Sequence, residues 1–336
     1  MKLQSLNDIQ RLLPPKESIY KCQAEEAVRE FMTRWQIKPR HFDDYNTMSS
    51  FLYANATSAK RLQAACTIHS MFFFIDDLFF DTDHFDARDF SIELESGNDF
   101  KSIGHFLADL MHIFRTGELP NHPSLIQQAF AEMRKEVLQQ ATAEWYEIFT
   151  EGIQGYITAV IQRETDLRRG NKRILTDMKS FLDIRLRDTG GLHTCQLIEL
   201  TKNAFLPAEL RNHEQIQYLT WLAIAMASLV NDIFSYHKDV VIEKSDFNLV
   251  KILMDTQKLS FDEAVHESVK IVNNYADLFV EQRVQLPVVG QQEDWIVKQY
   301  VDGLAEMMSG NVYWHASTNR YRSPDSPFVE LQNLNK

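Results

Sequence analysis

The sequence predicts an all-α protein, and three observations lead to this fold class. Only 11 glycines and 9 prolines occur among 336 residues, so long stretches of the chain carry no turn signal. Apolar residues recur at helical spacing between the breaks, and no segment shows the strict alternation or the hairpin turns of a sheet. Hydrophobic residues make up 44% of the chain, which is enough to fill a core of packed helices.

The breaks divide the chain into roughly ten helices of ordinary or greater length. The longest helical patterns cover residues 122–169, as one or two helices, and residues 213–239. No internal repeat, low-complexity linker or shift in composition marks a second domain, so we expect one domain over residues 1–336. The breaks themselves lie at Pro14 and Pro15, near Pro39, around Gly97, over 116–123, near Gly170, at Pro207 and over 285–290.

Charge and cysteine content limit the partners and the compartment. The formal net charge of -12 argues against nucleic acid or an anionic membrane as a partner, and an anionic ligand would need local cations. Three widely separated cysteines, Cys22, Cys66 and Cys195, indicate neither a disulfide framework nor a zinc knuckle, so we expect a reducing, cytoplasmic location. The first residues lack the apolar region of a signal peptide, and no run approaches the ~18 apolar residues of a membrane span. We therefore expect no membrane insertion.

Residues 72–83, FFFIDDLFFDTD, place acids among aromatic side chains. On a helix, Asp76 shares a face with its phenylalanine neighbours, and Asp77 and Asp81 are one turn apart. Burying an unpaired carboxylate costs several kcal/mol, roughly, so these acids need a cation or water beside them. A helix that ends here with solvated acids would fit the same residues. The phenylalanines on the Asp76 face are Phe72, Phe73, Phe79 and Phe80.

A second oxygen-rich stripe lies in residues 231–239, NDIFSYHKD. Asn231, Ser235 and Asp239 are spaced four residues apart, so one helix face presents an amide oxygen, a hydroxyl and a carboxylate. These are hard ligands of the kind that Mg²⁺ prefers. An ordinary polar stripe would have the same spacing. Two such stripes on separate helices predict a site for several metal ions more strongly than either does alone.

A magnesium cluster of this kind usually binds phosphate oxygens, and a diphosphate also calls for basic side chains. Any single basic residue could equally be solvated surface. The candidate cations are Arg185, Arg187, Lys238 and Arg320.

With these elements in this order, the chain resembles the class I terpene synthases, most closely the microbial type, over essentially its full length. The resemblance implies a helical bundle around a central cavity, an isoprenoid diphosphate substrate, three Mg²⁺ ions with substrate bound, and a monomer or homodimer. The family's first metal motif, DDxxxD, matches Asp76, Asp77 and Asp81. Its second, NDxxSxxKE, matches Asn231, Asp232, Ser235, Lys238 and Asp239, with Asp239 in place of the usual glutamate.

The resemblance also implies roles for other residues. Arg185 lies 46 residues before the motif asparagine, the spacing of the family's diphosphate sensor, and Asp188 would link this sensor to a helix break. At that break, near Thr189 and Gly190, a backbone carbonyl would face the reacting allylic carbon, although a plain helix end would show the same local sequence. Asp76 is the firmest metal ligand, whereas the choice between Asp77 and Asp81 stays open. The terminal Arg-Tyr pair of the family corresponds to Arg320 and Tyr321.

A carbocation formed from such a substrate needs apolar, dry and electron-rich walls, which aromatic faces supply. For any single aromatic residue core packing is the more frequent role, and the resemblance favours Phe73 and Trp314. The residues one and two turns before Asn231 are small and would leave a deep cavity. This weakly favours the twenty-carbon geranylgeranyl chain over the fifteen-carbon farnesyl chain as substrate. The small residues are Ala223, Ala227 and Ser228, and the candidate walls are Phe72, Phe73, Phe79, Phe80, Tyr313 and Trp314.

The expected function is therefore a magnesium-dependent terpene cyclase that releases diphosphate. A chain-elongating prenyltransferase on the same fold is one alternative, but it would be expected to carry a second aspartate-rich motif where this chain reads NDIFS. A helical scaffold without turnover is another alternative, kept open by the shorter arm of Asp239.

Overall fold

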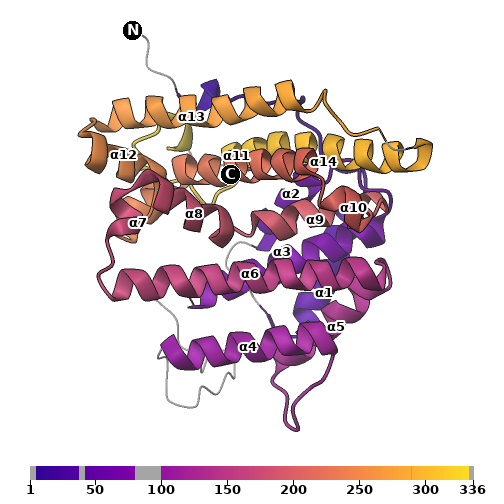
Figure 1. Cartoon of the computed structure of the whole chain (residues 1–336). Coiled ribbons are helices and arrows are strands. Elements are labelled where there is room, and N and C mark those ends of the chain that lie inside the picture. Colours follow the sequence, from indigo (N-terminus) through magenta and orange to yellow (C-terminus); the bar gives the residue numbers. More distant parts are fainter. Residues whose placement is uncertain (1–4, 38–41, 80–99, 289, 333–336) are drawn as a thin grey trace.

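The protein is all-helical in the computed structural model, which describes residues 5–37, 42–79, 100–288 and 290–332 (Figure 1). The described part contains fourteen α-helices, more than the roughly ten that the breaks predict. The α-helices are α1 (Lys21–Arg34), α2 (Phe42–Leu52), α3 (Ala59–Phe79), α4 (Phe100–Thr116), α5 (Leu125–Leu138), α6 (Ala143–Arg168), α7 (Arg173–Thr176), α8 (Met178–Asp188), α9 (Gly191–Lys202), α10 (Ala208–Arg211), α11 (Glu214–Tyr236), α12 (Leu249–Gln257), α13 (Phe261–Gln282) and α14 (Gln291–Ser317). Three shorter elements are η1 (Leu6–Asp8), η3 (His237–Ile242) and η4 (Val329–Leu331).

The pattern over 122–169, predicted as one or two helices, forms two. Thr142 accepts a hydrogen bond from the backbone N–H of Trp145 at 3.2 Å and begins α6 there. The one-turn helices α7 and α10 are too short to give a periodic signal.

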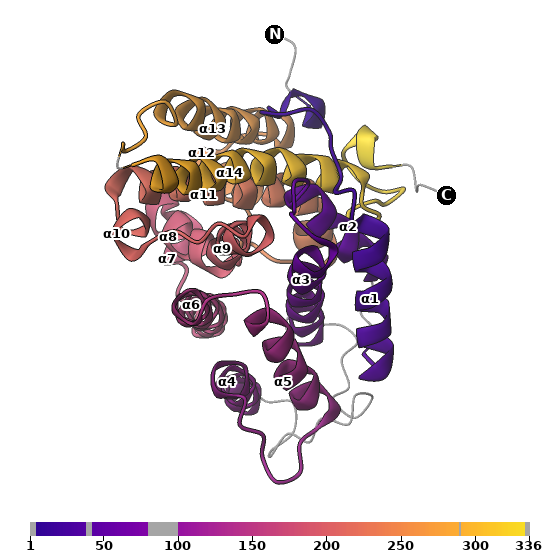
Figure 2. The same cartoon turned by 90° about the vertical axis from the view of Figure 1, so that its right-hand side faces the viewer.

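Helix α11 lies at the centre of the bundle and packs against α8, α9, α12, α13 and α14 (Figures 1 and 2). It continues into η3, and this continuous helix, Glu214–Ile242, is long and apolar enough to cross a membrane by length and composition. However, 78% of its most apolar window is buried inside the protein. Its position as a core helix therefore accounts for its composition.

The remaining helices pack on the other sides of the bundle. Helices α4 and α6 run alongside each other on the side opposite α13, and α3 contacts α1, α2, α5 and α9 (Figures 1 and 2). One hydrophobic cluster of buried side chains runs through the bundle, from Leu6 in the first described segment to Leu331 near the last.

The predicted break between α8 and α9 is present. Helix α8 ends at Asp188 with Thr189 as its C-terminal capping residue, and Gly190 adopts a φ of 71°, a left-handed conformation that glycine accepts at little cost. A Cβ atom on Gly190 would also lie 2.6 Å from Cε1 of His193, so the position excludes a side chain for steric reasons as well. The chain therefore turns sharply at this point.

Candidate active site

A cavity of about 400 Å³ lies among α3, α6, α8, α9, α11 and α14, a size typical of small-molecule sites. It brings together residues that the sequence places far apart, including Asp76 of the first oxygen-rich stripe, the stripe that begins at Asn231 and the sensor region. The predicted residues that line it are Phe72, Phe73, Asp76, Arg185, Asp188, Thr189, Gly190, Asn231, Ser235, Lys238, Asp239, Trp314, Arg320 and Tyr321.

Three sequence-based assignments are wrong. Arg187 is exposed and pairs with Asp183 at 3.0 Å, because it lies on the outer face of α8. Tyr313 points away from the cavity and donates its hydroxyl to the Leu13 carbonyl at 3.1 Å. Ala223 is buried in the helix core and does not line the cavity.

Some predicted residues cannot be placed. Phe80 and Asp81 lie outside the described residues, and so do the side chains of Asp77 and Phe79 at the end of α3.

Aromatic rings form one wall of the cavity. The Phe73 ring stacks on Tyr45, with ring centres 4.1 Å apart and an angle of 3° between the planes, and Trp314 lies 6.2 Å from Phe73. Trp314 is held by a hydrogen bond from its indole N–H to the Asp44 carbonyl at 2.7 Å. The guanidinium carbon of Arg320 lies 5.6 Å from the Phe73 ring centre, within the range of a cation–π contact. A cation is therefore already accommodated beside this aromatic wall.

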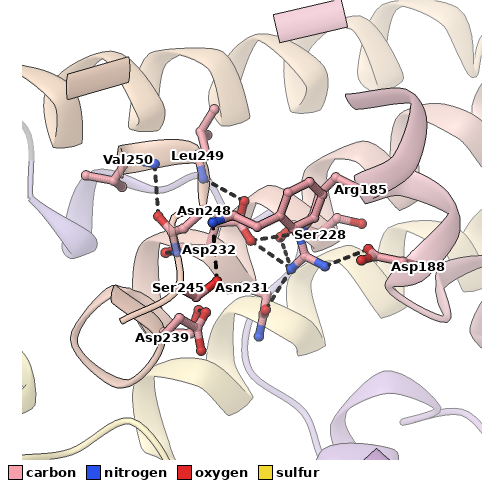
Figure 3. A network of polar contacts seen from close by, with 12 residues as sticks. Arg185, Asp188, Ser228, Asn231, Asp232, Asp239, Ser245, Asn248, Leu249 and Val250 are labelled. Carbon is pink, nitrogen blue, oxygen red and sulfur yellow. Dashed lines mark hydrogen bonds and ion pairs between the residues drawn. The ribbon is translucent and has the colours of Figure 1, made fainter. Parts of the chain in front are cut away.

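Arg185 is the centre of a buried polar network (Figure 3). Its Nε donates to Asp232 Oδ1 at 2.8 Å, one terminal nitrogen lies 3.2 Å from Asp188 Oδ1, and the other donates to Asn231 Oδ1 at 2.9 Å. Burial acts to lower the pKa of Arg185, but the Asp232 and Asp188 carboxylates raise it more, so the guanidinium stays charged. Burial raises the pKa of Asp232 to about 6 despite this ion pair.

The network also fixes the neighbouring helices. Asp232 Oδ2 accepts the backbone N–H of Leu249 at 2.9 Å, and Asn248 donates to the Asp232 carbonyl at 2.8 Å (Figure 3). Asp232 therefore connects α11 with the start of α12, while Asn231, the residue before it, faces the cavity.

Arg163 on α6 is a site residue that the sequence analysis missed. It lines the cavity and donates to Asp188 Oδ2 at 2.6 Å, so Asp188 is shared between Arg163 and Arg185. Burial acts to lower the pKa of Arg163, whereas Asp188, Glu164 and Asp76 raise it more. No motif marks Arg163, because its partner Asp188 lies on a different helix.

The second oxygen-rich stripe is present but its last turn is not α-helical. The helix changes from α to π after Tyr236, and Lys238 and Asp239 belong to the π-helical turn η3. Such turns are rare in proteins, and those that occur often lie at functional sites. Ser235 still donates its hydroxyl to Asp239 Oδ2, so these two predicted ligands remain adjacent.

The donor set of this face fits a hard divalent cation. Asn231, Ser235 and Asp239 present oxygen atoms to the cavity that Asp76 also lines, and oxygen donors are what Mg²⁺ and similar ions require. Among the described residues no group of three or more His, Cys, Asp or Glu side chains could hold a metal by itself. The amide oxygen of Asn231 and the hydroxyl oxygen of Ser235 add two neutral donors to the carboxylates of Asp76 and Asp239 that line the same cavity.

Lys238 lies within this polar region. Its ammonium group is 2.5 Å from Glu243 Oε1 and 3.8 Å from Asp239 Oδ1. A phosphate oxygen that entered the cavity could exchange for these carboxylates, since Lys238 lines the same space.

Three histidines line the cavity from different helices: His69 on α3, His193 on α9 and His315 on α14. Burial lowers the pKa of His69 to about 3, with a smaller effect of His193, and burial lowers the pKa of His193 and of His315 to about 4. All three are therefore neutral near pH 7. They share no sequence spacing, so no motif predicts them.

We expect His69→Gln to change how stability depends on pH. The pKa of this histidine is about 6.5 in the unfolded chain and about 3 in the folded protein. The free energy of unfolding of wild type therefore decreases as the pH falls below 6.5. Glutamine does not titrate. Relative to wild type, the variant should gain about 2 kcal/mol between pH 6.5 and pH 5, at about 1.4 kcal/mol per pH unit.

Urea unfolding at pH 7.5, 6.5 and 5 measures this difference. His122→Gln, at an exposed position before α5, is the matched control and should follow wild type. A constant difference between His69→Gln and wild type across this range would show that the His69 environment does not exclude the proton.

Comparisons with known proteins identify the family. The model for terpene synthase family 2, C-terminal metal binding, matches residues 67–277, so the chain belongs to this family. A sesquiterpene synthase of Cyclocybe aegerita is 26% identical over 324 residues, covering 92% of this chain and 84% of that protein. The germacrene A synthase of Nostoc punctiforme is 24% identical over 221 residues, covering 66% of this chain and 67% of that protein.

Solved structures confirm the fold. α-Eudesmol synthase superimposes with a TM-score of 0.76 at 18% identity, covering 91% of this chain and 97% of that one. Hedycaryol synthase gives a TM-score of 0.74 at 18% identity, covering 94% and 99%. The protein is thus a microbial-type class I terpene synthase, a lyase that acts on an isoprenoid diphosphate and depends on divalent metal.

Proposed function

We propose that the chain is a Mg²⁺-dependent cyclase of farnesyl diphosphate that forms a sesquiterpene hydrocarbon or alcohol. The observation that carries this proposal is the shared cavity, in which Asp76, the stripe from Asn231 to Asp239, the Arg185 network and the aromatic wall meet. We further propose that residues 1–336 form one catalytic domain, located in the cytoplasm, which acts as a monomer or homodimer.

The fifteen-carbon substrate is supported by the relatives. The relative from Cyclocybe aegerita is named a sesquiterpene synthase, and the (+)-T-muurolol synthase of Streptomyces clavuligerus, 28% identical over 253 residues, is described as cyclising (2E,6E)-farnesyl diphosphate. That match covers 73% of this chain and 56% of that protein. Of the three small residues that favoured geranylgeranyl diphosphate, only Ala227 and Ser228 line the cavity, which weakens that alternative.

The metal site would consist of Asn231, Ser235 and Asp239 on one side and Asp76 on the other, with Asp77 or Asp81 as a further ligand. When bound, three Mg²⁺ ions would neutralise charge on the diphosphate as it leaves. Asn231, Ser235 and Asp239 would orient their oxygens towards that position before substrate enters.

The basic residues would stabilise the leaving group. Heterolysis of the allylic C–O bond sends both electrons to the diphosphate, whose negative charge grows as the bond breaks. Arg185, Lys238 and Arg320 lie in the cavity wall and would bind this charge, with Tyr321 next to Arg320. Binding that strengthens in the transition state accelerates the reaction, so no side-chain nucleophile is needed.

The carbon cation would then react within the apolar part of the cavity. Phe72, Phe73 and Trp314 would exclude water and face the cation with their electron-rich rings, as we also propose for Phe79 and Phe80. Asp188 would couple Arg185 to the turn at Thr189 and Gly190, which lines the cavity beside the cation.

Incubation of the purified protein with geranyl, farnesyl and geranylgeranyl diphosphates tests this function. We expect cyclic fifteen-carbon products from farnesyl diphosphate, detected by gas chromatography with mass detection, and complete loss on addition of a chelator. Products from geranylgeranyl diphosphate alone would establish the twenty-carbon alternative.

Two other outcomes would contradict the proposal. Longer linear diphosphates after addition of isopentenyl diphosphate would identify a chain-elongating enzyme. Magnesium-dependent thermal protection by diphosphate without any product would identify a scaffold that binds the ligand but does not turn it over.

A further inference from the structure

The side-chain amide of Asn231 has a defined orientation. Its Oδ1 accepts a hydrogen bond from Arg185 at 2.9 Å, and because arginine can only donate, the amide atom beside it must be the oxygen. The Nδ2 end then lies 2.9 Å from the Tyr321 hydroxyl and 3.1 Å from His315 Nε2. Three neighbours therefore surround this one amide.

His315 can contact Asn231 only as an acceptor. Its Nδ1 lies 2.7 Å from the Asn311 carbonyl, one turn earlier on α14, and a carbonyl cannot donate. The ring proton is therefore on Nδ1, and Nε2 presents a lone pair to the amide N–H of Asn231. The ring is buried, stacks on Tyr321 at 5.3 Å with 4° between the planes, and meets Trp314 edge-on at 4.7 Å. Packing on both sides holds it in place.

Tyr321 does not distinguish the oxygen end of the Asn231 amide from the nitrogen end. A phenolic hydroxyl can donate or accept, so it would satisfy either end of the Asn231 amide after a rotation of its hydrogen. The two ends of an amide differ little in size, and packing alone does not distinguish them. His315 is therefore the neighbour on this side that favours one end over the other.

We propose that His315, at the Nδ2 end of the Asn231 amide, is a positioning residue that acts with Arg185 at the Oδ1 end to hold the orientation a metal ligand requires. This inference rests on the proposed function, since it assigns Asn231 to the metal. Reversal of the amide would direct two N–H groups at a cation, which is repulsive. Groups that orient a ligand in this way commonly change metal affinity by about 10- to 100-fold when they are removed.

A matched pair of variants tests the proposal. In His315→Asn the shorter amide reaches the position of Nδ1 but leaves nothing at that of Nε2, so Asn231 loses its acceptor. In His315→Gln the amide reaches the position of Nε2 and can accept, although it can also donate. We expect the Mg²⁺ concentration for half-maximal binding to rise about 10-fold in His315→Asn and about 3-fold in His315→Gln.

Mg²⁺ is titrated in the presence of inorganic diphosphate, and binding is measured by calorimetry and by the shift in thermal unfolding. Neither measurement requires turnover. Tyr313→Phe is the control, because Tyr313 lies on the same helix and its hydroxyl bonds to Leu13 outside the cavity. It should bind Mg²⁺ as wild type does.

A second measurement separates orientation from stability. Asn231→Asp has two equivalent oxygens and no amide to orient, so adding His315→Asn to it should change Mg²⁺ binding less than in wild type. Equal effects in both backgrounds, or unchanged Mg²⁺ binding in His315→Asn, would overturn the inference and leave the proposed function intact. A wild-type protein that binds no Mg²⁺ with diphosphate would overturn the metal assignment itself, and the inference with it.

Discussion

Asn231→Ala is expected to lower kcat/KM for the preferred diphosphate at least about 100-fold, because it removes an oxygen donor from the proposed metal face. The substitution leaves Arg185 with Asp232 and Asp188 as partners, so the buried network persists. Loss of the amide hydrogen bonds should cost only about 1 to 3 kcal/mol of folding stability. Activity should therefore fall far more than stability.

Steady-state kinetics over a range of Mg²⁺ concentrations, together with urea unfolding, checks this expectation. Asn231→Asp is the matched control, because it keeps an oxygen at the same position and should retain more activity than the alanine variant. If Asn231→Ala kept turnover within about tenfold of wild type, Asn231 could not be a metal ligand, and the cavity would need a different set of donors.

The fold class could be predicted from the sequence because helical periodicity and scarce turn residues are local signals. The limits of this prediction are also local. The turn at Thr142 contains neither glycine nor proline, and the change from α to π geometry after Tyr236 leaves no mark in the pattern of apolar residues. Apolar periodicity does not report the hydrogen-bond register of η3, the π-helical turn that follows α11.

The site could be predicted where its residues lie in motifs with fixed spacing. Helix geometry predicts that Asn231, Ser235 and Asp239 share one face, and the structure places that face and Asp76 in one cavity. Arg163 and His315 were missed because each is defined by a partner on another helix: Asp188 on α8 for Arg163, and Asn231 on α11 for His315. Tyr313 was wrongly placed in the cavity because it neighbours Trp314, and adjacent residues on a helix point in different directions.

The second large expected effect is that of Arg185→Met, which should lower both activity and stability. The wild-type Arg185 guanidinium donates hydrogen bonds to oxygens of Asp232, Asp188 and Asn231 at the same time, and the residue is only 8% exposed. Removing one partner of a buried ion pair typically costs about 3 to 5 kcal/mol. Loss of a cation that binds the leaving group should reduce kcat by about 100- to 1,000-fold.

Arg185→Lys separates charge from geometry. Lysine keeps a positive charge but as a single compact group, which cannot match three oxygens in the way that a planar guanidinium does. We expect Arg185→Lys to recover part of the stability that Arg185→Met loses, and little of the activity. Recovery of near wild-type activity would mean that the charge alone, and not its orientation by Asp232 and Asp188, supports ionisation of the substrate.

The pH dependence of stability provides an independent test of the same ion pair. In the folded protein the pKa of Asp232 is about 6, above that of the unfolded chain, and loss of Arg185 would raise it further. A carboxyl group with a raised pKa in the folded state binds protons there first, so its stability contribution is present at low pH and is lost as the pH rises through that pKa. The stability deficit of Arg185→Met should therefore shrink as the pH falls from 7 to 5, relative to wild type at each pH. A deficit that stayed constant would indicate that lost packing, and not the unpaired Asp232 carboxylate, accounts for the cost.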